Sequence, residues 1–120
     1  MAGINANGAS VMLTGLSTNA GFVSLHTADP GTTGTSEVTG GSPAYARKAI
    51  TWGSPASSAM NNSAQIVFDV PTGTTIRFLG YWSASTGGTF YGSRALDANQ
   101  TYTSQGTYTL AIGNIVESIA

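Results

Sequence analysis

The sequence contains no cysteine and only one histidine among its 120 residues. Disulfide bonds and thiolate metal sites are therefore excluded, and the redox compartment cannot be inferred. Charged residues make up 8% of the chain and the formal net charge is −1, so no basic stripe is available for nucleic acid. No apolar run reaches the roughly 18 residues of a membrane span, and no signal peptide is predicted at the N-terminus.

The scarcity of charge is informative, because an average globular domain has about 25% charged residues. A surface with so little charge is either neutral and polar or buried against partner subunits. The composition therefore favours a component of a larger assembly. At 120 residues, the chain has the size of one domain with a single thin core, such as two packed sheets.

Turn residues divide most of the chain into short segments that alternate as half-buried strands do. Strands are expected at residues 22–27, 45–52, 63–70, 74–85, 89–96, 101–112 with a break at 104–106, and 115–119, with loops or turns at 53–62, 86–88, 97–100 and 113–114. This spacing predicts an all-β fold, either an antiparallel β-sandwich or a jelly-roll-like module.

The first twenty residues differ from the rest. Residues 1–9 are expected to form a mobile or partner-bound arm. The spacing of Met12, Leu13 and Leu16 is compatible with one short helix that ends near residue 18 or 19. We therefore expect an N-terminal arm with a short helix at 1–20 and a single β-sandwich domain at 21–120.

A long polar loop at residues 28–43 follows the first expected strand. It starts beside His26, the only histidine, and contains two of the five acidic residues, Asp29 and Glu37. Asp29 precedes a proline and a glycine, which predicts a turn. A loop of this length is uncommon in a compact domain and indicates a function or packing against a neighbour.

Catalysis and metal binding are the specific hypotheses for this loop. His26 and Asp29 could form a general base and its orienting carboxylate, but no Gly-x-Ser-x-Gly motif supplies a nucleophile. We favour a structural role, in which His26 ties the strand end to the loop by a hydrogen bond. A metal site from His26, Asp29 and Glu37 lacks the spacing of a ligand motif, so no metal or other cofactor is expected.

The aromatic and basic residues leave further alternatives open. Exposed aromatic side chains could bind sugar, and the candidates are Trp52, Tyr81, Trp82, Phe90 and Tyr91. At period-two spacing, about half of them should instead lie in the core. Three arginines lie inside expected strands, Arg47, Arg77 and Arg94, and could pair with Asp69 or Glu117 or remain exposed.

Several motifs resemble those of small structural virion proteins of tailed bacteriophages. They are SLHTADPG at 24–31, EVTGGSPAYAR at 37–47, TW at 51–52, FDVPTGTT at 68–75, YWSA at 81–84 and GGTFYG at 87–92. Relatives of this kind are labelled tail fibre or minor virion proteins. The resemblance implies a virion component without enzyme activity that works as a homo-oligomer, and it brings no residue-level site.

Our main hypothesis from the sequence is a capsid decoration or minor capsid (cement) protein that stabilises the head through contacts between subunits. The alternative is a tail-fibre or tail-tip module, possibly carbohydrate-binding. The expected partners are the major capsid protein or other virion proteins and further copies of the chain, without nucleic acid or membrane. The expected location is the virion, most simply the capsid surface, after assembly in the bacterial cytoplasm. Candidate loop anchors or interface residues are His26, Asp29, Glu37, Tyr45, Arg47, Trp52, Tyr81 and Trp82.

Overall fold

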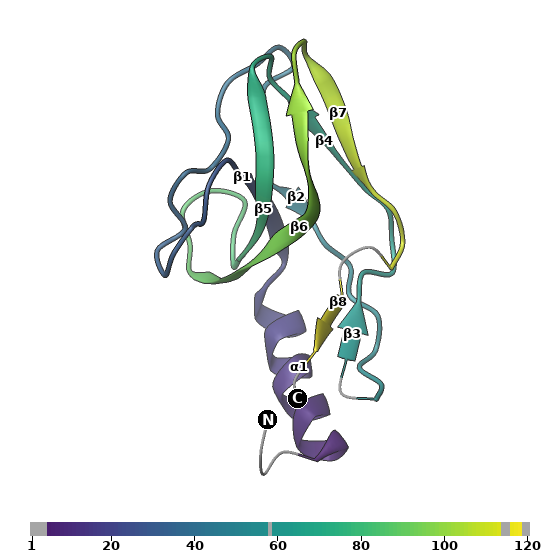
Figure 1. Ribbon diagram of the computed structural model, residues 1–120. Coiled ribbons are helices and arrows are strands. Elements are labelled where there is room, and N and C mark those ends of the chain that lie inside the picture. The colour runs from purple at the N-terminus through teal and green to yellow at the C-terminus, as the bar shows by residue number, and fades with distance from the viewer. Residues whose placement is uncertain (1–4, 58, 114–115, 119–120) are drawn as a thin grey trace.

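The computed structural model describes residues 5–57, 59–113 and 116–118. They form an elongated body with extents of 46 × 26 × 23 Å. The sheets that carry most of the strands lie at one end, and one helix with a small two-stranded sheet lies at the other (Figure 1). The prediction of a mostly β protein with antiparallel sheets and an N-terminal helix is confirmed.

Helix α1 spans Ala6–Asn19 and is longer than expected. The side chain of Asn5 accepts a hydrogen bond from the backbone N–H of Gly8 and so caps the first turn. Residues 6–9, which were expected to belong to a mobile or partner-bound arm, form the first part of this helix, and residues 1–4 lie outside the described residues. Ala9 and Leu13 are buried on one face of the helix, which contacts strands β3 and β8.

The main sheet has the strand order β2-β1-β5-β6, and all of its pairs are antiparallel. Its strands are β1 (Phe22–His26), β2 (Lys48–Ala49), β5 (Thr74–Trp82) and β6 (Phe90–Tyr102). Strand β1 is buried on both faces: Val23 and Leu25 point to one side, whereas Ser24 and His26 point to the other, and all four are fully buried. The sheet must therefore be covered on both sides.

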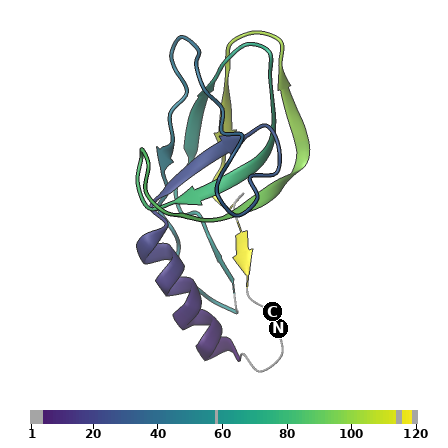
Figure 2. The ribbon, with the colours of Figure 1, turned by 90° about the vertical axis from the view of Figure 1, so that its left-hand side faces the viewer.

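Two smaller antiparallel pairs complete the sheets. Strands β4 (Ile66–Val70) and β7 (Gly106–Leu110) pair with each other, and β3 (Ala59–Asn61) pairs with β8 (Val116–Ser118). The core contains Val23, Leu25, Ile76, Leu79 and Tyr81 from the main sheet together with Ile66, Phe68, Val70 and Leu110 from the β4–β7 pair. The inner face of the main sheet thus packs on β4 and β7. The outer face is covered by the loop at 28–43 (Figure 2).

Three expected elements differ in the structure. The expected turn at 97–100 is part of β6, where the register between β5 and β6 shifts between Ile76 and Phe78 and leaves extra residues in β6. The expected loop at 53–62 contains the short strand β3. The expected strand at 45–52 is reduced to Lys48–Ala49, because the segment before it is held by side-chain contacts and not by a ladder. The residue pattern of one sequence does not distinguish a turn from a bulged strand, or a strand from a segment that is held by side-chain contacts.

Candidate functional site

The loop at 28–43 leaves β1 at His26 and begins with a tight turn. The side-chain Oδ1 of Asp29 accepts a 2.9 Å hydrogen bond from the backbone N–H of Gly31, as is common when an aspartate opens a turn. The N–H groups of Gly34 and Thr35 then donate to the carbonyl of Pro30 at 3.0 and 3.1 Å. Asp29 itself is exposed, so its role in the structure is local to the turn.

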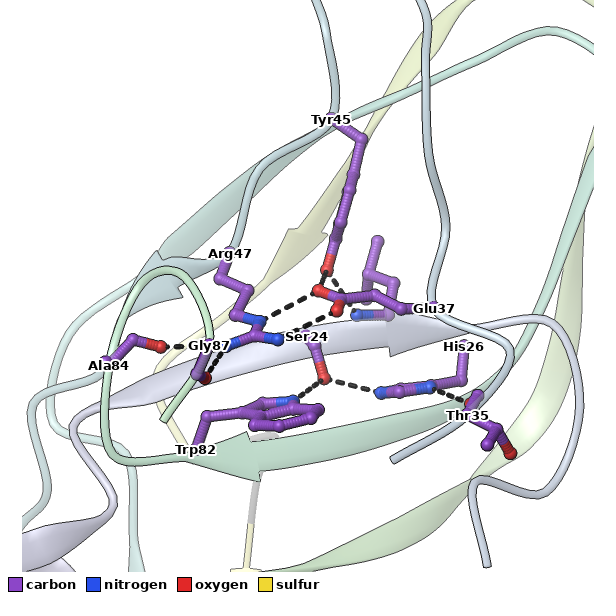
Figure 3. Close-up of polar contacts among 10 residues, drawn as sticks. Ser24, His26, Thr35, Glu37, Tyr45, Arg47, Trp82, Ala84 and Gly87 are labelled. Atoms are coloured by element: carbon purple, nitrogen blue, oxygen red, sulfur yellow. Dashed lines mark hydrogen bonds and ion pairs between the residues drawn. The ribbon is translucent and has the colours of Figure 1, made fainter. Parts of the chain in front are cut away.

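A chain of three buried side chains lies beneath this loop (Figure 3). The ring atom Nδ1 of His26 lies 2.7 Å from the carbonyl oxygen of Thr35. A carbonyl only accepts, so Nδ1 carries the proton and Nε2 is the acceptor. The hydroxyl of Ser24 therefore donates to Nε2 over 2.6 Å, and its oxygen accepts the indole N–H of Trp82 at 2.8 Å.

The environment keeps His26 neutral. Burial lowers the pKa of His26 below its usual value, and this effect outweighs the hydrogen bond to Thr35 and the charge of Glu37, which both act to raise it. The charge of Arg47 lowers the pKa further. A neutral ring with one donor and one acceptor nitrogen is what the chain from Trp82 through Ser24 to Thr35 requires.

A serine hydroxyl on a histidine nitrogen is also the arrangement of a nucleophile and its base. Here, however, both Ser24 and His26 are 0% exposed, and the ring of Phe90 packs on Trp82 and His26 at centroid distances of 5.0 and 6.2 Å. A substrate has no access to the hydroxyl. The chain of hydrogen bonds consequently joins β1, β5 and the loop, and it performs no chemistry.

Gly80 makes this buried arrangement possible. It lies opposite Ser24 in the β1–β5 register, and a Cβ atom at this position would lie 2.5 Å from the Ser24 hydroxyl oxygen and 2.6 Å from Nε2 of His26. Those separations are too short for any side chain. The hydrogen-bonded pair thus occupies the space that a larger residue at position 80 would need.

Arg47 joins three parts of the outer face (Figure 3). Its Nε and Nη2 donate to the two carboxylate oxygens of Glu37, each at 3.0 Å. Its Nη1 donates to the carbonyls of Ala84 and Gly87 at 3.0 and 2.8 Å, which lie in the β5–β6 connection. The guanidinium also lies over the ring of Trp82, with 3.7 Å between its carbon and the ring centroid. This planar, forked geometry suits arginine and not lysine.

Tyr45 connects the same carboxylate to β1. Its hydroxyl donates to Oε2 of Glu37 at 2.8 Å and accepts the backbone N–H of Leu25 at 3.0 Å. Its ring stacks on Phe68 at a centroid distance of 6.4 Å. Burial raises the pKa of Tyr45 far above its usual value, so the hydroxyl remains a donor. We call the set Ser24, His26, Glu37, Tyr45, Arg47 and Trp82 the anchor cluster.

The remaining two sequence candidates lie on the other side of the sheet. Tyr81 is buried in the core, and Trp52 meets it edge to face at 5.7 Å while its indole N–H donates to the carbonyl of Ala20 at 3.0 Å. The structure therefore brings His26, Glu37, Tyr45, Arg47 and Trp82 together and separates Trp52, Tyr81 and Asp29 from them. Sequence reasoning missed Ser24, although its spacing of two from His26 in a strand places both side chains on one face.

Arg47 and Arg77 both contact the loop that follows β1. Arg47 pairs with Glu37, an acid that sequence reasoning had not proposed as its partner. Arg77 donates from Nη1 to the carbonyl of Thr27 at 2.9 Å. Both arginines thus fasten the loop that follows β1, because Thr27 and Glu37 lie on either side of its turn.

A surface pocket of about 300 Å³ adjoins the anchor cluster, and its lining includes Glu37, Thr39, Tyr45, Arg47 and Thr86. The polar groups of Glu37, Tyr45 and Arg47 are already engaged with one another and with backbone carbonyls, as described above. Among the described residues there is no group of three or more side chains suited to a metal ion, and none of their helices is long and apolar enough to cross a membrane.

A family model described as podophage GP4 fiber I protein gp80 matches residues 11–118, which is most of the chain. No curated protein sequence matches it.

Proposed function

Because the chain belongs to the family of podophage GP4 fiber I proteins (gp80), a family of non-enzymatic structural components of the phage tail fibre, we propose that it works as an assembly module within the fibre. The match over residues 11–118 is the observation that carries this proposal. It includes most of α1 together with the sheets, so the proposed module comprises both ends of the body.

The family supports a fibre better than the capsid surface that our main sequence hypothesis favoured. In favouring the capsid, that hypothesis gave weight to the short chain, because a fibre protein commonly has a longer shaft or attachment segment. The elongated body of 46 × 26 × 23 Å reduces the weight of this objection, because one short protein can form a segment of a fibre built from several. The partners we propose are other virion proteins and further copies of the chain, and we no longer propose the major capsid protein. We retain the proposal that assembly takes place in the host cytoplasm.

The anchor cluster supplies the rigidity that such a module needs. Arg47 and Glu37 fasten two loops to the outer face of the main sheet, and His26 fastens the start of the longer loop from beneath. We propose that these residues are structural loop anchors, and that residues 21–120 form one domain. A loop fixed at several points keeps one shape, which lowers the entropy lost when a partner binds.

The carbohydrate-binding alternative gains little support from the side chains. Trp82 is 8% exposed and Tyr81 is 3% exposed, so neither offers a ring face to a sugar. Trp52 packs on Tyr81. Tyr91, another of the aromatic candidates, is 42% exposed, so a receptor-binding role would have to use this residue or others outside the anchor cluster.

The location of the protein in the particle tests the proposal. Antibodies raised against the purified chain would be located on virions by electron microscopy. We expect label on the tail fibres and loss of the fibres from particles made without the gene. Label distributed over the head lattice would overturn the fibre assignment and restore capsid decoration.

A further inference from the structure

Helix α1 has a second face that the rest of the described chain leaves exposed. Val11 is 73% exposed and Met12 is 47% exposed, the two largest apolar exposures on this helix. With Gly8 and Gly15 they follow the spacing i, i+3, i+4, i+7, which places all four on one side of a helix. We call these four residues the outer stripe. The buried residues Ala9 and Leu13 lie on a different side and contact the body.

The helix has no charged residue anywhere between Ala6 and Asn19. A helix on the surface of a globular protein normally turns a charged face to water. This helix also contains two glycines and several β-branched or hydroxylated residues, which are poor helix formers. A helix of this length is marginal without packing, so an additional contact along the outer stripe would stabilise it.

We propose that the outer stripe is the surface through which copies of this chain associate, with their α1 helices parallel and side by side. This inference rests on the proposed function as an assembly module and names the surface that it uses. In a parallel arrangement of identical helices each residue lies close to its own copy, so a charged residue on the stripe would repel itself. The uncharged α1 avoids this repulsion.

The shape of the outer stripe also suits a second copy of itself. Gly8 and Gly15 lie seven residues apart, the repeat of helices that pack along their length. An added Cβ at Gly15 would meet no atom within 4 Å, so the surface there is open to an approaching helix. Val11 and Met12 project between the glycines. The apolar side chains of one copy can therefore pack over the glycines of the other copy.

The position of α1 favours the parallel orientation. The helix lies at one end of the elongated body, away from the main sheet and the β4–β7 pair (Figure 1). Copies related by a rotation axis along the helices would keep their sheets together at the opposite end. An antiparallel pair would send the two sets of sheets in opposite directions and would not give a fibre segment with one polarity.

The oligomeric state of the purified full-length chain tests this surface. Light scattering coupled to size exclusion should show an oligomer for the wild type, and Val11→Glu or Met12→Glu should raise the concentration needed for assembly at least tenfold. Ser10→Glu adds the same charge on another side of the helix and should leave assembly unchanged. Circular dichroism and thermal melts establish that each variant is folded.

Cross-linking tests the orientation on a nearly unaltered chain, since the wild type has no cysteine. Thr18 continues the outer stripe by three residues and lies near the end of α1. We expect Thr18→Cys to form a disulfide with its own copy under mild oxidation, and Ser10→Cys not to. A chain that stays monomeric at all concentrations, or an oligomer that survives both glutamate variants, would overturn the proposal. Assembly without the Thr18→Cys cross-link would overturn the parallel orientation.

These outcomes are separable from a failure of the fibre assignment. Association through α1 is measured on purified protein, whereas location is measured on virions. A chain that associates through the outer stripe but decorates the head would retain this inference and lose the proposed function.

Discussion

The guanidinium carbon of Arg47 lies 3.7 Å from the centroid of the Trp82 ring. The same guanidinium makes a two-point ion pair with Glu37, so one side chain joins the β5 strand to a loop that leaves β1. Arg47 is 9% exposed and Glu37 is 21% exposed in their side chains. The pair is therefore shielded from most solvent and should contribute more than a surface salt bridge.

Replacing Arg47 should destabilise the protein substantially. Arg47→Ala leaves Glu37 partly buried without its cation and frees the carbonyls of Ala84 and Gly87, which we expect to cost about 3 kcal/mol of unfolding free energy. Arg47→Lys keeps the charge but loses the planar, forked set of N–H donors. It should recover less than half of the unfolding free energy that Arg47→Ala loses. Urea unfolding measures both. Lys48→Ala, next in the chain and outside the anchor cluster, is the control; equal losses at 47 and 48 would contradict the anchoring role.

Gly80→Ala should be one of the most damaging single-methyl additions in the chain. The new Cβ would lie 2.5 Å from the Ser24 oxygen and 2.6 Å from Nε2 of His26, so the buried pair must move, at a cost of about 1 to 3 kcal/mol. Gly21→Ala is the matched control, because a Cβ there meets nothing within 4 Å. Thermal melts of the two variants should differ clearly, and similar melting temperatures would argue against the close packing at position 80.

Ser24→Ala should weaken the fold without adding any steric strain. It removes the acceptor of the Trp82 indole N–H and the donor to His26, leaving two buried polar groups unsatisfied at a cost of about 1 to 3 kcal/mol. Ser24→Cys, which is similar in size and only a weak hydrogen-bonding group, should give an intermediate loss. An Ala variant as stable as the wild type would mean that water or a rearranged ring replaces the serine.

Stability should fall as the pH is lowered through the range in which free histidine titrates. The pKa of His26 is lowered in the folded state from its ordinary value of 6.5. Around and below pH 6.5, this histidine therefore binds a proton more readily in the unfolded chain than in the folded chain. The contribution is complete above pH 6.5 and declines below it, with a limiting slope of about 1.4 kcal/mol per pH unit. Unfolding free energies measured from pH 8 to 5 should show this decline, and His26→Gln should remove it.

Local patterns predicted the strands best where the residues alternate regularly or form a short apolar run. The alternation at 63–70 and the apolar run at 22–27 correspond to β4 and β1. The turn expected at 97–100 was wrong because Asp97 to Gln100 have the composition of a turn but are carried in β6 through a shift in its register with β5. The strand expected from Tyr45 was mostly wrong because Tyr45 and Arg47 direct their hydrogen bonds through side chains to Glu37.

The candidate residues were recovered unevenly for a related reason. Residue type alone singled out the lone histidine, Arg47 and the tryptophans, because histidine, arginine and tryptophan are rare in this chain. The sequence does not contain the distance between Arg47 and Trp82, and it gave no reason to choose Glu37 over Asp69 as the partner of Arg47. Ser24 went unnoticed because serine is common here and its importance depends on what lies beside it.

The sequence by itself determined that this is a charge-poor, cysteine-free, antiparallel β protein of one domain's size, because composition and two-residue alternation act over a few neighbouring positions. Its motifs also indicated a phage virion protein, and the family match assigned the chain to the tail fibre. Only the tertiary structure decided that the histidine is a buried structural residue, that the loop at 28–43 is fastened to the sheet through Arg47, and that Val11 and Met12 stay exposed. Burial and pairing between distant residues depend on how the strands cross, and a linear pattern does not contain that information.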